Sequence, residues 1–321
     1  MSIHTPLCDL LNIKYPIMLA GMGGVSFSEV CAAVSEAGGY GCLGMAGRTP
    51  DEIRTEMRKV RALTDKPFGV DLLAAVAGSL EASVEIIIEE GASAFVAGLG
   101  IPSAIITRLH EAGLKAFVVG GAVSHAVKAQ EAGCDAVICQ GSEGGGHTGL
   151  VGTFPLVAQA VQAVSIPVIA AGGIYDGRGL AAALALGAHG VWLGTRFIAS
   201  AEAHAGAMYK DAIIAARDVD TVRTKSYSGK PMRVRDNAWV KDWESRPSDI
   251  QPFPMQAMIS MQAGTMGGIG GQTEGLDADR SCFAMGQSAG GVKSIATCKE
   301  IVDTIMAEAV EAIGRVGRLV S

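Results

Sequence analysis

One histidine of the chain stands inside a run of glycines. The segment 140–149, QGSEGGGHTG, places His147 shortly after the apolar stretch 136–139. Glycine allows backbone N–H groups to approach a ligand closely where a Cβ would obstruct it. A histidine held in such a loop can transfer protons near neutral pH. A lone histidine is more often structural, but this setting favours a catalytic role for His147.

Two further glycine turns follow apolar stretches. Gly172 and Gly173 come after residues 167–170, and Gly194 and Thr195 come after residues 190–193. The N–H groups of Gly173 and Gly194, with the Thr195 hydroxyl, could satisfy the oxygens of a phosphate at helix N-termini. These glycines could instead serve only to form tight turns. Two such turns at neighbouring strand ends favour phosphate binding.

Small residues also follow the first apolar stretch. Gly21, Met22 and Gly23 leave room for a flat ring, and the Met22 thioether offers a polarizable contact. Together with the phosphate turns, this pattern fits a flavin lying across one end of the fold. The remaining candidate cofactor contacts are Asp71, Gln140, Glu143, Gly145 and Gly146. Glu143 could orient the His147 ring or bind a ribityl hydroxyl, and could equally be a solvated loop carboxylate.

The chain repeats one local pattern, a helical segment that ends in glycine and then a short apolar strand. Glycine just beyond a helix favours the left-handed conformation that ends it, and strands apolar on both faces are typical of a covered parallel sheet. The predicted strands are 16–19, 40–43, 68–73, 94–97, 115–119, 136–139, 167–170 and 190–193. The predicted helices include 28–37, 50–63, 82–90, 103–112, 124–132, 153–164 and 178–186.

Eight strand–helix units predict an α/β fold, a (β/α)₈ TIM barrel. A doubly wound open sheet is the alternative, but no G-x-G-x-x-G follows the first strand. The repeat ends after Arg217. We therefore expect a barrel over 1–217, a smaller inserted substrate or lid region over 218–280, and a return to the barrel over 281–321 with a last helix over 292–317.

Composition excludes several classes of protein. The net charge is −6 at pH 7, so no general attraction to nucleic acid or to an anionic membrane is expected. No apolar run reaches the length that spans a membrane, and residues 1–6 lack the pattern of a signal peptide. The seven cysteines show neither a CxxC pair nor zinc-ligand spacing. We expect a cytoplasmic protein with reduced, buried thiols and no metal.

The chain resembles the nitronate monooxygenase family, formerly called 2-nitropropane dioxygenases. The resemblance runs through residues 15–22, 141–149, 168–179, 184–188 and 194–197 in the family's order. It implies a barrel that binds FMN and oxidises alkyl nitronates with O₂ to a carbonyl compound and nitrite. It also implies that Met22, Gly145, Gly172, Gly173, Gly194 and Thr195 contact FMN. His147 matches the family's active-site histidine, which hydrogen-bonds the nitro group or takes the α-proton of a nitroalkane.

The same motifs are shared with flavin-dependent enoyl-acyl-carrier-protein reductases and with NAD(P)H:quinone reductases. The first alternative is therefore an NAD(P)H-dependent flavin reductase of an enoyl thioester, enone or quinone. The basic residues in 223–241 could then accept a phosphate-bearing substrate. The second alternative is a phosphate-ligand binding or flavin-storage module without turnover. A homo-oligomer is compatible with each hypothesis.

Overall fold

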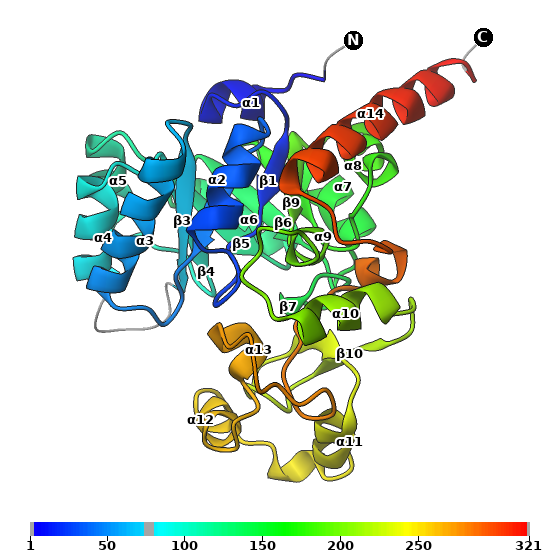
Figure 1. Ribbon diagram of the computed structural model, residues 1–321. Coiled ribbons are helices and arrows are strands. Elements are labelled where there is room, and N and C mark those ends of the chain that lie inside the picture. Colours follow the sequence, from blue (N-terminus) through cyan, green and yellow to red (C-terminus); the bar gives the residue numbers. More distant parts are fainter. Residues whose placement is uncertain (1–2, 74–79, 320–321) are drawn as a thin grey trace.

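The computed structural model describes residues 3–73 and 80–319 of the chain. Parallel strands form one sheet in the order β1-β9-β8-β6-β5-β4-β3-β2. These strands are β1 (Ile17–Leu19), β2 (Gly41–Gly44), β3 (Phe68–Leu73), β4 (Ala94–Gly98), β5 (Lys115–Gly120), β6 (Ala136–Gln140), β8 (Val168–Ala171) and β9 (Gly190–Leu193). A parallel bridge between Met18 and Tyr40 joins the edge strands β1 and β2. The sheet thus closes into the predicted (β/α)₈ barrel (Figure 1).

Helices cover the outside of this barrel (Figure 1). They are α2 (Ser28–Glu36), α3 (Pro50–Leu63), α4 (Leu80–Glu89), α5 (Ile106–Glu111), α6 (Val123–Glu131), α7 (Thr153–Ala163), α8 (Gly177–Ala185) and α14 (Cys298–Gly317). The glycines predicted to end five helices all have left-handed φ angles: Gly38, Gly91, Gly113, Gly133 and Gly187.

Two predicted helices start later than expected. The helix predicted over 103–112 begins at Ile106, and the last helix begins at Cys298 instead of residue 292. Residues 287–291 form a separate 3₁₀ turn, η2 (Gln287–Gly291). Thr297 then caps α14 through a capping box with Glu300, which fixes where the last helix begins.

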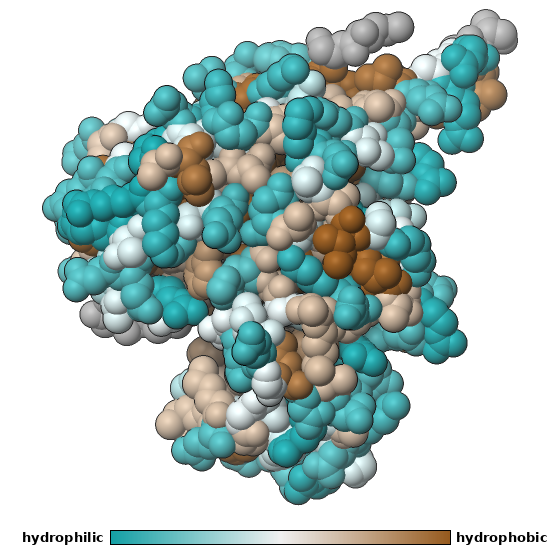
Figure 2. Space-filling view, in the orientation of Figure 1, coloured by the Kyte–Doolittle hydropathy of each residue, from teal (hydrophilic) through white to brown (hydrophobic). Residues whose placement is uncertain are grey.

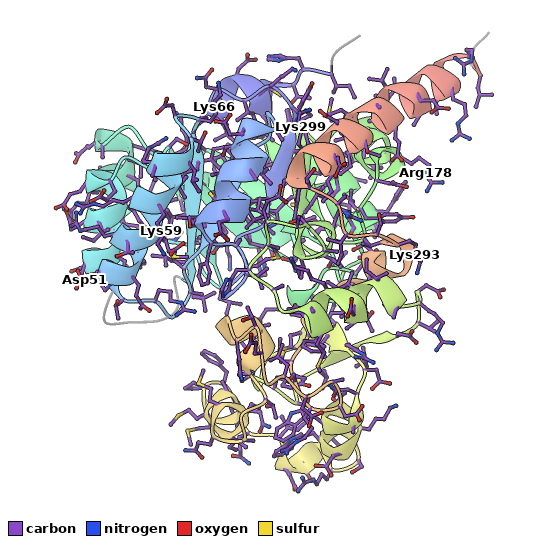
Figure 3. All side chains as sticks on the ribbon, in the orientation of Figure 1. Asp51, Lys59, Lys66, Arg178, Lys293 and Lys299 are labelled. Carbon is purple, nitrogen blue, oxygen red and sulfur yellow. The ribbon has the colours of Figure 1, made fainter. Side chains whose placement is uncertain are left out.

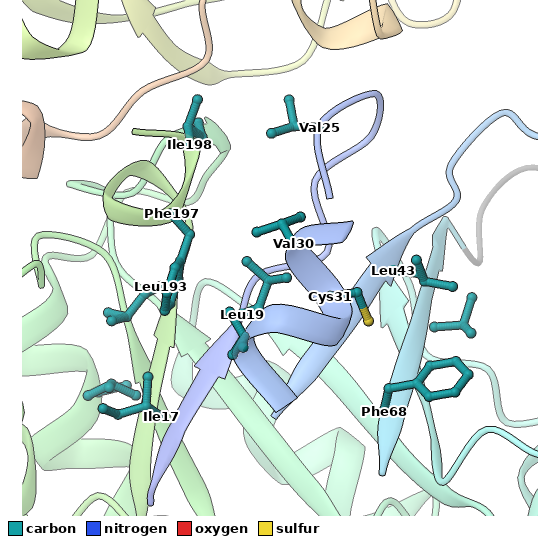
Figure 4. Close-up of a cluster of buried hydrophobic side chains, with 14 of the residues drawn as sticks. Ile17, Leu19, Val25, Val30, Cys31, Leu43, Phe68, Leu193, Phe197 and Ile198 are labelled. Carbon is teal, nitrogen blue, oxygen red and sulfur yellow. The ribbon is translucent and has the colours of Figure 1, made fainter. Parts of the chain in front are cut away.

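Alternation along the strands separates two layers of apolar side chains. Ile17 and Leu19 of β1 pack outward, with Val30 of α2, in the layer between strands and helices shown in Figure 4. Met18, between them, faces the barrel interior with Tyr40 and other inward residues. The interior cluster also includes Cys42, Val96, Phe117, Ile138, Ile169 and Trp192.

A short N-terminal helix closes one end of the barrel interior. Helix α1 (Pro6–Leu11) was not among the predicted elements, and it places Leu7, Cys8 and Leu11 in the interior cluster. An added Cβ at Gly190, at the start of β9, would lie 2.5 Å from Leu7, so α1 sits at the N-terminal ends of the strands. The opposite end, where the strands finish, is the end at which barrels of this kind bind their ligands.

A second, smaller lobe lies beyond those strand ends (Figure 1). It contains an antiparallel sheet in the order β10-β11-β7, formed by β10 (Thr221–Thr224), β11 (Met232–Arg235) and β7 (Gly146–His147). Its helices are α10 (Ala207–Ala215), α11 (Ala238–Glu244), η1 (Pro247–Asp249), α12 (Met255–Gln262) and α13 (Gly267–Gly270). Tyr227, Met232, Val234, Val240 and Cys282 form its core. The domain limits at 217 and 280 stay a prediction.

The surface seen in Figure 2 is mostly hydrophilic, with small separate hydrophobic patches. Charged side chains such as Lys59 of α3 and Arg178 of α8 lie on the outside of the barrel (Figure 3). None of the helices in 3–73 and 80–319 combines the length and apolar character needed to cross a membrane. All seven cysteines are buried and unpaired, as the sequence predicted.

Candidate functional site

The predicted site residues all lie at or just beyond the C-terminal ends of five barrel strands, β1, β3, β6, β8 and β9. In a parallel barrel these ends meet at one mouth, so residues distant in sequence come together there.

Four backbone N–H groups at this mouth lack an acceptor within the part of the chain that the structure describes. They belong to Gly172 and Gly173 beyond β8 and to Gly194 and Thr195 beyond β9. The two strands are parallel neighbours, so the two turns lie side by side. Gly172 and Gly173 have φ angles of +96° and +74°, which other residues rarely adopt. Unsatisfied N–H groups clustered at strand ends suit the oxygens of a phosphate.

Side chains beside these turns leave little room for larger residues. The Met22 sulfur lies over Gly194, 3.3 Å from the position of an added Cβ. At Gly21 an added Cβ would lie 2.1 Å from the Asp71 Cβ. Gly23 faces the smaller lobe instead, and an added Cβ there would lie 3.7 Å from the Ile269 carbonyl of α13. Gly21 and Gly194 therefore keep this part of the mouth open.

His147 stands in β7, which pairs with β11 of the smaller lobe. Its Nε2 lies 2.9 Å from the Ser228 hydroxyl oxygen. That hydroxyl donates to the Lys230 carbonyl at 3.1 Å, and the Lys230 N–H donates to it at 3.3 Å. With the hydroxyl proton directed to the Lys230 carbonyl, Nε2–H is the donor to Ser228, an assignment of the tautomer from the hydrogen-bond network. The Nδ1 of His147 then bears a free lone pair.

The electrostatic setting keeps this histidine neutral. Burial, followed by the nearby positive charge of Lys230, lowers the pKa of His147 from 6.5 to about 4. At neutral pH the ring can therefore accept a proton, and it carries no charge that would pair with an anion.

The loop that presents His147 is braced from within the barrel. The Gln140 side-chain amide, at the end of β6, donates to the carbonyls of Gly145 and His147 at 3.1 Å each. An added Cβ at Gly145 would lie 2.8 Å from the Gly286 nitrogen. The Gly286 N–H in turn donates to the Thr195 hydroxyl at 2.9 Å. The histidine loop and the turn at Thr195 are thereby connected through Gly286.

Glu143 is engaged in the fold. Its carboxylate accepts hydrogen bonds from the Thr153 N–H at 2.8 Å and from the Thr153 hydroxyl at 2.9 Å, at the start of α7. Its stem lies over Gly173, 3.5 Å from the position of an added Cβ. In this structure Glu143 contacts the turn at Gly173 and bonds to α7, and no hydrogen bond joins it to His147.

Several basic side chains of the smaller lobe form no ion pair within the described residues, among them Arg223, Lys225, Lys230, Arg233 and Arg235. Arg223 and Arg233 lie directly opposite each other on β10 and β11. Like charges at opposed strand positions destabilise a sheet unless an anion compensates them. The Arg233 guanidinium donates to the Ser142 carbonyl at 2.8 Å, which places this pair beside the histidine loop.

The structure gives three residues roles in the site that sequence reasoning did not assign to them. Ser228 and Lys230 set the state of His147, and Gly286 connects two loops. Ser228 begins a Ser-Gly-Lys-Pro turn, which is typical of a loop with a fixed shape and is the signal that could have found it.

Comparison with known proteins identifies the relatives of the chain. The sequence model of the family described as "Nitronate monooxygenase" matches residues 4–82 and 75–308. A (3aS,4S,5R,7aS)-5-hydroxy-7a-methyl-1-oxo-octahydro-1H-indene-4-carboxyl-CoA dehydrogenase of Mycobacterium tuberculosis is 36% identical, with 100% of both chains covered. A probable nitronate monooxygenase of Staphylococcus saprophyticus is 35% identical over 81% of this chain and 86% of that protein.

Solved structures agree with these relatives. FabK from Thermotoga maritima superposes with a TM-score of 0.91 at 38% identity, covering 99% of this chain and 100% of that chain. The fold and these matches show that the protein is a flavin-dependent oxidoreductase built on a (β/α)₈ barrel. Within that class, the chain belongs to the nitronate monooxygenase family.

Proposed function

We propose that the protein binds FMN at the barrel mouth and uses His147 to take a proton from the carbon beside an electron-withdrawing group. The phosphate of FMN would be held by the N–H groups of Gly172, Gly173, Gly194 and Thr195. Their lack of acceptors within the described chain supports this fit. Bound FMN would supply the hydride or electron transfer that no side chain can perform.

The hydrogen bond between His147 and Ser228 is the observation that carries this proposal. With Nε2–H directed to Ser228, the free Nδ1 lone pair can accept the α-proton of a carbon acid. A neutral ring suits a neutral carbon acid better than it suits an anion, because it offers no opposite charge.

The first candidate substrate is an acyl-CoA thioester. Arg223 and Arg233 lie beside the histidine loop and form no ion pair with a carboxylate of the described chain. Two such positive charges suit a substrate that carries several phosphates. The relative covered over its whole length is named as a dehydrogenase of a carboxyl-CoA compound, which supports the same class. His147 would take the proton next to the thioester carbonyl. In the reverse direction, with NAD(P)H as the electron donor, the same position would return that proton to an enoyl thioester.

Oxidation of an alkyl nitronate by O₂ to a carbonyl compound and nitrite is the second candidate. The family match favours it, since it extends over most of the chain. His147 would here take the α-proton of the parent nitroalkane.

Three parallel assays on FMN-loaded protein separate these candidates. Acyl-CoA with an artificial electron acceptor tests dehydrogenation, enoyl-CoA with NADH or NADPH without oxygen tests reduction, and propionate 3-nitronate in air tests nitrite release. We expect the thioester assays to exceed the nitronate assay. The His147→Asn variant should lose on the order of 100-fold or more in turnover while it still binds FMN. A yellow protein inactive in all three assays would contradict the proposal.

A further inference from the structure

A mostly buried carboxyl group, which has no hydrogen-bond partner among the described residues, stands at the barrel mouth. Val70 and Leu72 of β3 pack in the outer layer, so Asp71 between them faces the barrel interior. Its Cβ lies 2.1 Å from an added Cβ at Gly21, and its Oδ1 lies 3.6 Å from one at Gly98. Gly21 follows β1 and Gly98 ends β4, so the carboxyl group lies between the C-terminal ends of these two strands.

No side-chain or backbone donor within 3–73 and 80–319 bonds to this carboxyl group. Asp71 is nevertheless only 8% exposed. Asp176, by contrast, caps α8 and pairs with Arg178. A buried carboxylate without donors is costly, whereas a buried carboxylic acid has a proton to donate.

The surroundings provide no charge that would favour ionisation. Burial is the cause that raises the pKa of Asp71 well above its usual value. A titratable neighbour is the Cys42 thiol of β2, whose own pKa is raised by burial and then by Asp71. No lysine, arginine or histidine of the described chain shifts the pKa of Asp71.

We propose that Asp71 is a neutral carboxylic acid that donates a hydrogen bond to bound FMN and makes the reduction potential of the flavin depend on its proton. This inference rests on the FMN site proposed above. A flavin gains negative charge on reduction, and a donor in a dry site stabilises that charge more than water would. Ionisation of Asp71 would remove the donor and add a like charge, so it would lower the potential.

The test measures reduction potentials of FMN-loaded protein against reference dyes from about pH 6 to about pH 10, a range that includes strongly raised carboxyl pKa values. Asp71→Asn keeps a donor but cannot ionise. Asp71→Ala removes the donor, and Asp211→Asn, on the exposed side of α10, is the matched control. The expected result is a wild-type potential that falls below that of Asp71→Asn as the pH rises. Asp71→Ala should bind FMN on the order of tenfold more weakly, the loss of one hydrogen bond.

A second measurement does not use the flavin. Difference infrared spectra between wild-type and Asp71→Asn apoprotein at neutral pH should show the carbonyl stretch of a protonated acid. Parallel pH dependence of the potential in wild type and Asp71→Asn, with no acid band, would overturn the inference while the FMN site stands. Failure of the wild-type protein to bind FMN would overturn both.

Discussion

His147 and Ser228 are 81 residues apart in the chain, yet their side chains lie 2.9 Å apart where β7 pairs with β11. One residue belongs to a barrel loop and the other to the smaller lobe. The lobe therefore takes part in setting the proton of the candidate base. It does more than cover the mouth.

Replacing Ser228 should change how His147 titrates. In Ser228→Ala the ring loses the acceptor that fixes its tautomer, so turnover should fall on the order of tenfold, about the worth of one hydrogen bond. The pH profile of turnover should shift as well, and ¹⁵N spectra of labelled histidine should show a mixture of tautomers. The control is Ser248→Ala, since Ser248 is exposed in η1. An unchanged pH profile and a single tautomer would show that Ser228 does not position the base.

The lowered pKa of His147 predicts a loss of stability in acid. The unfolded chain binds this proton near pH 6.5 and the folded chain only near pH 4, so the unfolded state holds more protons between these values. The free energy of unfolding should therefore fall as the pH decreases through this range, by up to about 3 kcal/mol. Urea unfolding of wild type and His147→Asn at several pH values measures this. The free energy of unfolding of His147→Asn should depend less on pH between these values than that of the wild type. Equal pH dependence of the two proteins would contradict the lowered pKa of His147.

Glycine at position 21 is required by packing. Gly21→Ala would place a Cβ 2.1 Å from the Asp71 Cβ, and neither atom is the end of a flexible side chain. We expect a loss of about 1 to 3 kcal/mol in unfolding free energy, together with weaker FMN uptake. Gly317→Ala in α14 is the matched control, because nothing lies within 4 Å of its added Cβ. Equal unfolding free energies of the two variants would contradict the close contact between Gly21 and Asp71.

Arg223 should recognise the phosphates of the substrate. Its Nε is buried and has no hydrogen-bond partner among the residues that the structure describes. In Arg223→Gln the KM for an acyl-CoA should rise about tenfold, the value of one charge-assisted hydrogen bond. The KM for the same acyl group on N-acetylcysteamine, which has no phosphate, should not change. Lys241→Gln is the control, since Lys241 already pairs with Asp236. An equal rise for both thioesters would exclude phosphate recognition.

The barrel could be predicted from sequence because its signals are local. Most strands are apolar on both faces, and a glycine such as Gly113 or Gly133 ends the helix before the strand. The site glycines could be predicted for the same reason, because their turns directly follow strands that all end at the same side of the barrel.

Features that depend on distant partners could not be predicted. The two residues of β7 read as a glycine loop, and they become a strand only because β11 pairs with them. Ser228 could be assigned to His147 only once that pairing was known. Asp71 was expected to contact the cofactor, but its lack of a partner depends on β1, β2 and β4 together, which no local pattern specifies.

A crystal structure of the protein with FMN tests the central proposal most directly. We predict that the FMN phosphate accepts hydrogen bonds from the N–H groups of Gly172, Gly173, Gly194 and Thr195, and that the flavin ring lies at the mouth between Met22 and the loop of His147. A phosphate bound elsewhere, or a ring directed away from His147, would contradict it.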